Sequence, residues 1–93
     1  MNLKVVWTSR FKKDYKLAVK RRLNIKLLDD TIRMLASGKT LPEEYNDHQL
    51  TGNLKNYREC HIQPDWLLMY CIEKDILVLS LQRTGTHSDL FDK

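Results

Sequence analysis

Six residues with side chains suited to acid–base chemistry on a phosphate are spread over the second half of the chain. They are His48, His61, Asp65, Arg83, His87 and Asp89. Cleaving RNA without a metal needs a group that takes the proton of the attacking 2′-hydroxyl, a group that protonates the leaving 5′-oxygen, and a cation that holds the phosphate. Histidine, aspartate and arginine are the residue types for these tasks. The set therefore has the composition of a metal-free ribonuclease site, and no cofactor is expected.

Short apolar runs beside these residues predict the strands that would bring them together. Residues 57–62, 66–72 and 76–82 read as three strands joined by tight connections. Pro64 and Asp65 fit a type I turn, so the first two strands should form a hairpin with Ile62 opposite Leu67.

Alternation along that hairpin assigns its residues to two faces. The face expected to be core holds Arg58, Cys60, Ile62, Leu67, Met69 and Cys71. The face expected to reach water holds Tyr57, Glu59, His61, Leu68 and Tyr70. In the last strand the same alternation sends Leu77, Leu79 and Leu81 to the core together with Arg83. Because a buried arginine is unfavourable there, we expect the strand to end or bulge near Gln82.

The first half of the chain predicts one strand and two helices. Residues 3–7 read as a strand, and Thr8 or Ser9 then supplies a helix N-cap. The first apolar stripe consists of Phe11, Tyr15, Ala18 and Arg22, broadened by Leu17 and Val19. The second consists of Ile25, Leu28, Ile32 and Leu35, after Asn24 and before Ser37 and Gly38.

We therefore expect a single α+β domain over residues 1–93, with the plan β-α-α-β-β-β. A helical hairpin should pack on one face of a small, mainly antiparallel sheet. Residues 38–56 are polar and should form an ordered loop, pinned by Leu41, Tyr45, Leu50 and Leu54.

Positive charge is concentrated in the first predicted helix. The chain has 16 Lys+Arg against 12 Asp+Glu, and between Arg10 and Lys26 eight cations are opposed by Asp14 alone. This pattern suits a polyanionic partner, although a solvated helix face would give the same pattern. No apolar run approaches the roughly 18 residues needed to span a membrane, and no secretory segment is evident. We expect a cytoplasmic protein without membrane contact, whose Cys60 and Cys71 are ordinary buried thiols.

Three segments, in order and spacing, strongly resemble the YafQ branch of the RelE/ParE toxin superfamily of bacterial type II toxin–antitoxin pairs. They are residues 47–52 (DHQLTG), 57–70 (YRECHIQPDWLLMY) and 83–91 (RTGTHSDLF). The first half matches this family only as a pattern of strand, basic helix and helix.

This resemblance implies an endoribonuclease that cuts messenger RNA in the ribosomal A site and leaves a 2′,3′-cyclic phosphate. It implies an acid–base set of His48, His61, Asp65 and His87. It also implies that Arg83 holds the phosphate and that Trp66 and Phe91 shape the site or stack on bases. We expect Asp65 or His61 to be the base and His87 the acid, with His48 helping to hold the phosphate. The implied partners are a cognate antitoxin and the ribosome, whose RNA the exposed lysines of the first helix would contact: Lys12, Lys13, Lys16 and Lys20.

Each residue also has a plain structural interpretation. Asp65 could be only a turn residue, Trp66 could be core, and Arg83 could pair with Asp89 or Asp92. A zinc site of Cys60 with the three histidines lacks ligand spacing. Two other functions remain open: a ParE-like toxin that binds DNA gyrase without catalytic histidines, and a passive RNA-binding module.

Overall fold

The computed structural model of the chain describes residues 2–91. Its elements, in chain order, are β1 (Lys4–Trp7), α1 (Ser9–Lys20), α2 (Ile25–Ala36), the short 3-10 helix η1 (Glu43–Tyr45), β2 (His48–Gln49), a second 3-10 helix η2 (Gly52–Leu54), β3 (Arg58–Gln63), β4 (Trp66–Glu73), β5 (Val78–Gly85) and α3 (His87–Phe91).

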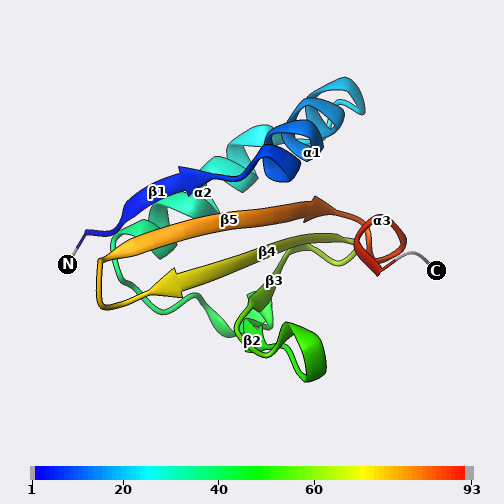
Figure 1. Cartoon of the computed structure of the whole chain (residues 1–93). Helices are drawn as coiled ribbons and strands as arrows, with labels where there is room; N and C mark the ends of the chain where they lie inside the picture. Colours follow the sequence, from blue (N-terminus) through cyan, green and yellow to red (C-terminus); the bar gives the residue numbers. More distant parts are fainter. Residues whose placement is uncertain (1, 92–93) are drawn as a thin grey trace.

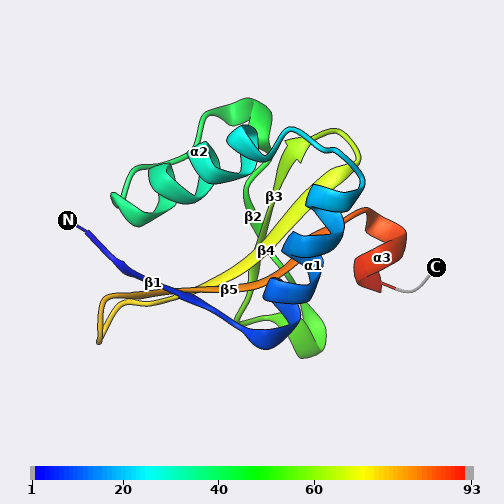
Figure 2. The same cartoon turned by 90° about the horizontal axis from the view of Figure 1, so that it is seen from above.

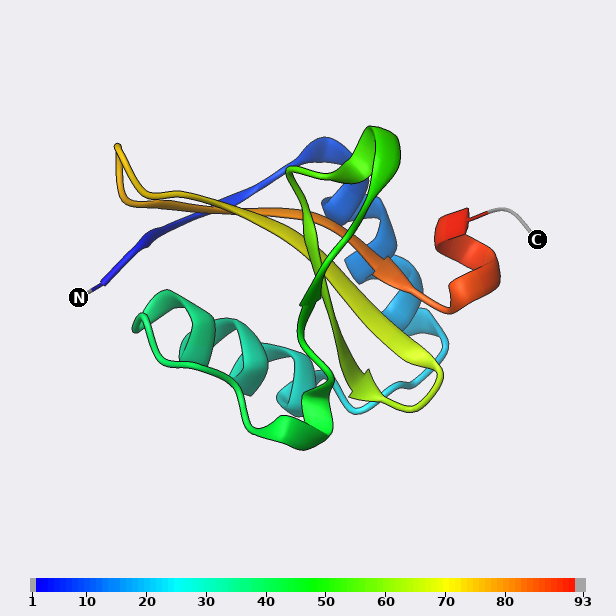
Figure 3. The same cartoon turned by 90° about the horizontal axis from the view of Figure 1, so that it is seen from below.

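The five strands form one sheet in the order β1-β5-β4-β3-β2, in which only the β1–β5 pair is parallel. Both long helices lie on one side of this sheet (Figure 1). They diverge from the connection at residues 21–24, with α1 over β5 and α2 extending toward the start of β1 (Figure 2). The opposite face carries no long helix and is bordered by η2 and α3 (Figure 3); we call it the open face. The predicted α+β plan with a helical pair on one face is confirmed.

The first helix is capped as expected, but Asn24 makes no side-chain cap hydrogen bond to α2. Arg22, expected on the first apolar stripe, lies beyond the end of α1 at Lys20. The Thr8 hydroxyl accepts a hydrogen bond from the backbone N–H of Phe11 at 3.1 Å and so caps α1. Helix α2 ends at Ala36, just before Gly38, whose φ of 82° suits glycine. Phe11 and Leu28 are fully buried against the sheet. Leu17 and Val19, in contrast, are 40% and 52% exposed, so the predicted broadening of the α1 stripe is wrong.

The predicted register of the β3–β4 hairpin is wrong by one residue. Leu67 pairs with His61 rather than Ile62, because β3 has an irregularity between His61 and Gln63. Since side chains alternate, this slip exchanges the two sets of residues on β4. Leu68 and Tyr70 belong to the core under the helices, with exposures of 0% and 1%. The core-facing set on β3, which includes Cys60, is as expected.

The bulge expected near Gln82 is present. Met69 of β4 pairs with Arg83 and Tyr70 pairs with Leu81, so Gln82 is the additional residue of β5. Leu79 and Leu81 precede it and are fully buried, whereas Leu77 lies outside the strand and is 43% exposed. Contrary to expectation, β5 continues past the bulge to Gly85.

Two segments contain more structure than the sequence indicates. The expected loop at residues 38–56 includes η1, the two-residue strand β2 and η2, and the expected tail contains α3. Within residues 2–91, no helix has the length and apolar character needed to cross a membrane.

Candidate active site

The sheet register places the predicted catalytic residues of the strands in two adjacent rows across the open face. One row runs His48, Glu59, Met69 and Arg83 from β2 to β5. The neighbouring row runs His61, Leu67 and Gly85, with β3 at one end and β5 at the other. Adjacent strands lie about 4.8 Å apart, so the second row spans roughly 10 Å.

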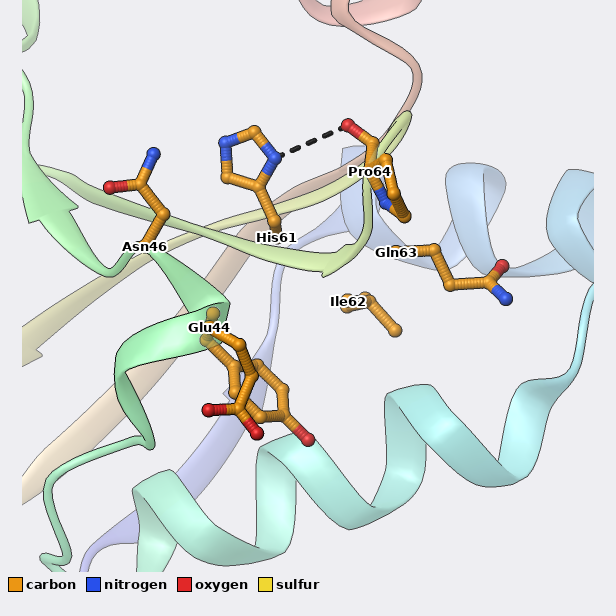
Figure 4. Close-up of a pocket in the computed structure, with 7 residues that line it drawn as sticks. Glu44, Asn46, His61, Ile62, Gln63 and Pro64 are labelled. Carbon is orange, nitrogen blue, oxygen red and sulfur yellow. Dashed lines mark hydrogen bonds between the residues drawn. The ribbon is translucent and has the colours of Figure 1, made fainter.

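His61 projects from β3 on the side away from α2, whereas its neighbour Ile62 points toward that helix (Figure 4). Its Nδ1 lies 3.3 Å from the backbone carbonyl oxygen of Pro64. Because a carbonyl oxygen only accepts, this contact requires Nδ1 to carry the proton. In the neutral ring, Nε2 then has a free lone pair and can accept a proton. His61 also borders a pocket with Glu44, Asn46 and Pro64.

His48 lies beside His61, with ring centroids 6.5 Å apart. Its Nδ1 is 2.7 Å from the carbonyl oxygen of Asn46, and its Nε2 is 3.5 Å from Oε1 of Glu59. Both ring nitrogens therefore face acceptors, an arrangement that is satisfied when both carry protons. Within residues 2–91, only one ring nitrogen of His61 has such a partner, so the two imidazoles differ in their surroundings.

The segment before His48 is fixed by a polar cluster on the other side of the sheet. Tyr70 donates a hydrogen bond to Oδ1 of Asp47 at 2.5 Å, and Arg58 lies 3.3 Å from Oδ2 of the same carboxylate. Burial and the hydrogen bond to Asp47 raise the pKa of Tyr70, so its hydroxyl remains a donor at neutral pH. Asp47 thus anchors β2 at the edge of β3.

Glu59 is a residue of this face to which the sequence assigned no role. It is only 5% exposed, and its Oε2 has no hydrogen-bond partner among the described residues. A buried carboxylate is costly unless it has polar partners, and Oε1 of Glu59 has His48 Nε2 at 3.5 Å. Alternation had placed Glu59 beside His61, but only the β2–β3 pairing, absent from the expected fold, brings it to His48.

Asp65 precedes the start of β4 and His87 follows the end of β5, and these two strand ends lie side by side in the sheet. Asp65 lies in the exposed β3–β4 turn and lines a small pocket with Trp66, Gly85 and Thr86. His87 is the exposed first residue of α3, and its ring centroid lies 4.8 Å from that of Phe91. The fold therefore brings the turn of Asp65 next to the residue that precedes His87.

A reciprocal cap holds α3, and so His87, in place. Thr86 Oγ1 accepts from the N–H of Asp89, and Oδ2 of Asp89 accepts from the N–H of Thr86, at 3.1 and 3.0 Å. Arg21, just after the end of α1, bonds the same Oδ2 at 2.8 Å. A Cβ on Gly85 would lie 2.9 Å from this oxygen, so the close approach requires glycine. These contacts hold the pKa of Asp89 down at about 2.

Arg83 pairs with a residue that the sequence did not indicate. Its Nε and Nη2 donate to Oδ2 and Oδ1 of Asp14 at 2.6 and 3.3 Å, and the N–H of Thr84 donates to Oδ2 at 3.1 Å. The alternative pairing with Asp89 is wrong because Asp89 bonds Arg21. Asp92, the other alternative, lies outside the described residues.

Trp66 occupies the position foreseen by its plain interpretation as core. Its side chain is 3% exposed, and its Nε1 donates to Oγ1 of Thr84 at 2.9 Å. Thr84 in turn donates to the carbonyl oxygen of Leu67 at 2.7 Å. From the core side of the sheet, Trp66 thus fixes the start of β4 against the end of β5. Phe91 is partly exposed beside His87 and remains available to a ligand.

Cys60 is fully buried in the core on the helix-covered side of the sheet. His61, the next residue, faces the open side, so the considered zinc set of Cys60 and the histidines does not share one surface. Burial raises the pKa of the Cys60 thiol, which makes thiolate ligation unfavourable there. Among residues 2–91, no group of three or more His, Cys, Asp or Glu side chains is arranged to hold a metal ion.

The four lysines considered for RNA contact are all exposed on α1: Lys12, Lys13, Lys16 and Lys20. They belong to the helix layer (Figure 1), whereas His48 and His61 come from β2 and β3 of the sheet. The lysines therefore lie in a different layer from His48 and His61, whereas Asp14 of the same helix bonds Arg83.

A family model described as "Bacterial toxin of type II toxin-antitoxin system, YafQ" matches residues 3–92. The curated "mRNA interferase toxin YafQ" of Escherichia coli strain K12 is 38% identical over 88 residues, which cover 94% of each chain.

Two solved structures extend the comparison to the fold. The toxin chain in the crystal structure of the E. coli DinJ-YafQ toxin-antitoxin complex superposes with a TM-score of 0.89 at 36% identity, covering 98% of this chain and 99% of that one. A metal-bound toxin from Helicobacter pylori superposes with a TM-score of 0.90 at 44% identity, covering 96% and 99%.

The cap that holds α3 predicts a specific pH dependence. The folded pKa of Asp89, about 2, lies below the unfolded value of about 3.9. Its stabilising contribution is therefore complete above about pH 4 to 5 and lost as the pH falls through about 2. Asp89→Asn should lower the free energy of unfolding at neutral pH, and the difference from the parent should shrink in acid. Urea denaturation at several pH values measures this, with Asp75→Asn in the exposed β4–β5 turn as control. A difference that is constant with pH would contradict the assignment.

Proposed function

The chain belongs to the YafQ family of toxins of bacterial type II toxin–antitoxin systems, and we propose that it cleaves messenger RNA in the A site of the ribosome. The proposal is supported by the two rows on the open face. They run from His48 and His61 to the last residues of β5, which include Arg83. His87 follows directly after this strand, in α3. A gyrase-binding toxin of the same fold would have no use for this set. The name of the E. coli relative, an mRNA interferase, supports the same activity.

In the proposed mechanism, the 2′-hydroxyl attacks the adjacent phosphorus, the 5′-oxygen leaves, and a 2′,3′-cyclic phosphate remains. His61 accepts the 2′-hydroxyl proton on Nε2, because its Nδ1 is committed to the Pro64 carbonyl. Asp65, at the tip of the same hairpin, is the alternative base. His87 protonates the 5′-oxygen from the other side of the site.

The negative charge of the RNA phosphates is met by side chains at both ends of the first row. His48, flanked by Asn46 and Glu59, and Arg83, flanked by Asp14, attract phosphate groups there. Phe91 offers a partly exposed ring for stacking on a base. Because the face is open and small, we infer that the ribosome orients the messenger on it, which places the site of action in the cytoplasm.

Removal of one acid–base group tests the catalytic assignment. His87→Ala or Asp65→Ala should relieve the growth arrest caused by expression of the toxin and slow messenger cleavage on ribosomes by about 10²–10⁴-fold. Both residues are exposed, so the variants should fold. The matched control is Ser88→Ala, the next exposed position on α3. If folded His87→Ala protein cleaves as fast as the control, His87 is not the acid.

We further propose that Lys12, Lys13, Lys16 and Lys20 dock the toxin on ribosomal RNA without reading sequence. Changing all four to Glu should weaken ribosome affinity and flatten its salt dependence while the preferred cleavage sites stay the same. A control of equal charge reverses the exposed residues Lys4, Lys39, Lys55 and Lys74. Affinity measured over a salt series separates the two variants. Equal losses in both would indicate net charge rather than a docking surface.

A cognate antitoxin is the second proposed partner, and the crystal structure of the DinJ-YafQ complex supports it. We expect an acidic segment, disordered alone, that folds on the toxin with help from the cations of α1. Co-expression of the neighbouring gene product should abolish growth arrest and messenger cleavage. Unchanged arrest in the presence of that product would instead favour a housekeeping ribonuclease.

A further inference from the structure

We propose that a small pocket between α1, β5 and α3 binds a phosphate of the RNA strand, with Arg10 and Arg83 as its cations and Asp14 as the residue that positions Arg83. The inference rests on the proposed ribonuclease function and deepens it. Nothing in the sequence motifs indicates Arg10 or Asp14, because both lie in the first half of the chain.

The pocket lies at the β5 end of the row that begins with His48. Met69 and Arg83, which are neighbours in that row, both line the pocket. The remaining lining comes from Arg10, Leu54, Tyr57, Gln82 and Leu90. Its volume is about 160 Å³, well below the roughly 300 Å³ at which pockets for whole small molecules begin. A phosphate group fits such a space, whereas a nucleotide does not.

The two cations differ in how their charge is balanced. Arg83 is held by Asp14 in a nearly buried ion pair, with side-chain exposures of 17% and 13%. Arg10, in the first turn of α1, is exposed, and no carboxylate of residues 2–91 lies within ion-pair distance of it. The pocket therefore keeps a net positive charge, which favours an anion.

Asp14 leaves Arg83 able to bind a ligand. A guanidinium has five N–H donors, and Asp14 takes one from Nε and one from Nη2, which leaves three. Asp14 is itself fixed, because the N–H of Thr84 donates to the same Oδ2. This N–H is available because β1 pairs with β5 only as far as Leu81. The carboxylate thus fixes the guanidinium plane at the bare edge of β5, with its remaining donors free.

The location of the pocket favours RNA as the source of the bound phosphate. Arg83 is two residues from Gly85, which ends the row of His61, so the pocket lies about 7 Å along β5 from that row. A strand that places its scissile bond at His61 would carry its phosphates along this face. Leu54 and Leu90 add apolar surface to the lining beside the two cations.

The test uses the purified toxin and a short 2′-O-methyl RNA oligonucleotide, which lacks the nucleophile and is not cleaved. Fluorescence anisotropy over a salt series gives the affinity and its salt slope. Arg10→Gln should weaken binding several-fold and reduce the slope by about 0.7, as expected for one lost phosphate contact on a single strand. Lys74→Gln removes the same charge at the exposed β4–β5 turn, far from α3 (Figure 3), and should leave both unchanged.

Asp14→Asn separates positioning from net charge. A purely electrostatic effect would tighten RNA binding, because an acidic group is removed. Loss of the Arg83 clamp should instead weaken it, and Asp14→Glu should restore part of the affinity. Thermal unfolding verifies that each variant is folded, and the exposed Arg10 variant tests the pocket even where the Asp14 variants fail to fold.

The outcomes distinguish this inference from the proposed function. Equal binding by Arg10→Gln and Lys74→Gln, or tighter binding by folded Asp14→Asn, would overturn the pocket even if the parent protein cleaves messenger on ribosomes. Arg10-dependent oligonucleotide binding by a parent protein that cleaves nothing would support the phosphate pocket and overturn the ribonuclease.

Discussion

A single additional residue in β5 determines which side of the sheet the second half of the site occupies. Before the bulge at Gln82, the alternating residues Leu79 and Leu81 fill the core. Without the bulge, Arg83 would follow them into it. With it, Thr84 takes the buried position and bonds Trp66, while Arg83 and Gly85 join the open-face rows. Helix α3, which carries His87, then starts from this side of β5 (Figure 3).

Features set by local sequence could be predicted, whereas those set by tertiary contacts could not. Local signals were sufficient for the two long helices, for an N-cap at Thr8 or Ser9, for the β3–β4 hairpin and for an end or bulge of the last strand near Gln82. The β3–β4 register was not predictable, because the irregularity after His61 has no composition that distinguishes it from a regular strand end. Motif resemblance located the candidate site residues, but their hydrogen-bond partners depend on tertiary structure. Asp14 is 69 residues from Arg83, and Glu59 reaches His48 only through a two-residue strand.

The exposed lysines proposed to attract RNA and the histidines proposed to act in cleavage lie on different sides of the sheet. The lysines of α1 are exposed in the helix layer, whereas the histidines occupy the opposite side of the sheet, over a floor of buried Leu67 and Met69. These lysines can therefore attract RNA without entering the site, whereas Arg10 of the same helix lines the pocket beside Arg83. The carboxylates of the site have local tasks: Asp14 holds Arg83, Glu59 faces His48, and Asp89 fixes α3. The two imidazoles of adjacent rows, His48 and His61, can thus differ in role, since their partners differ.

The central claim is that the open face activates the 2′-hydroxyl of messenger RNA as the nucleophile. The most direct measurement uses ribosomes programmed with a messenger that carries a single 2′-deoxynucleotide immediately 5′ of the bond that the toxin normally cuts. The account predicts that this bond stays intact, while the unmodified messenger is cut there and yields a 2′,3′-cyclic phosphate end. Cleavage of the deoxy-substituted bond at the normal rate, or a product with a 5′-phosphate, would contradict it.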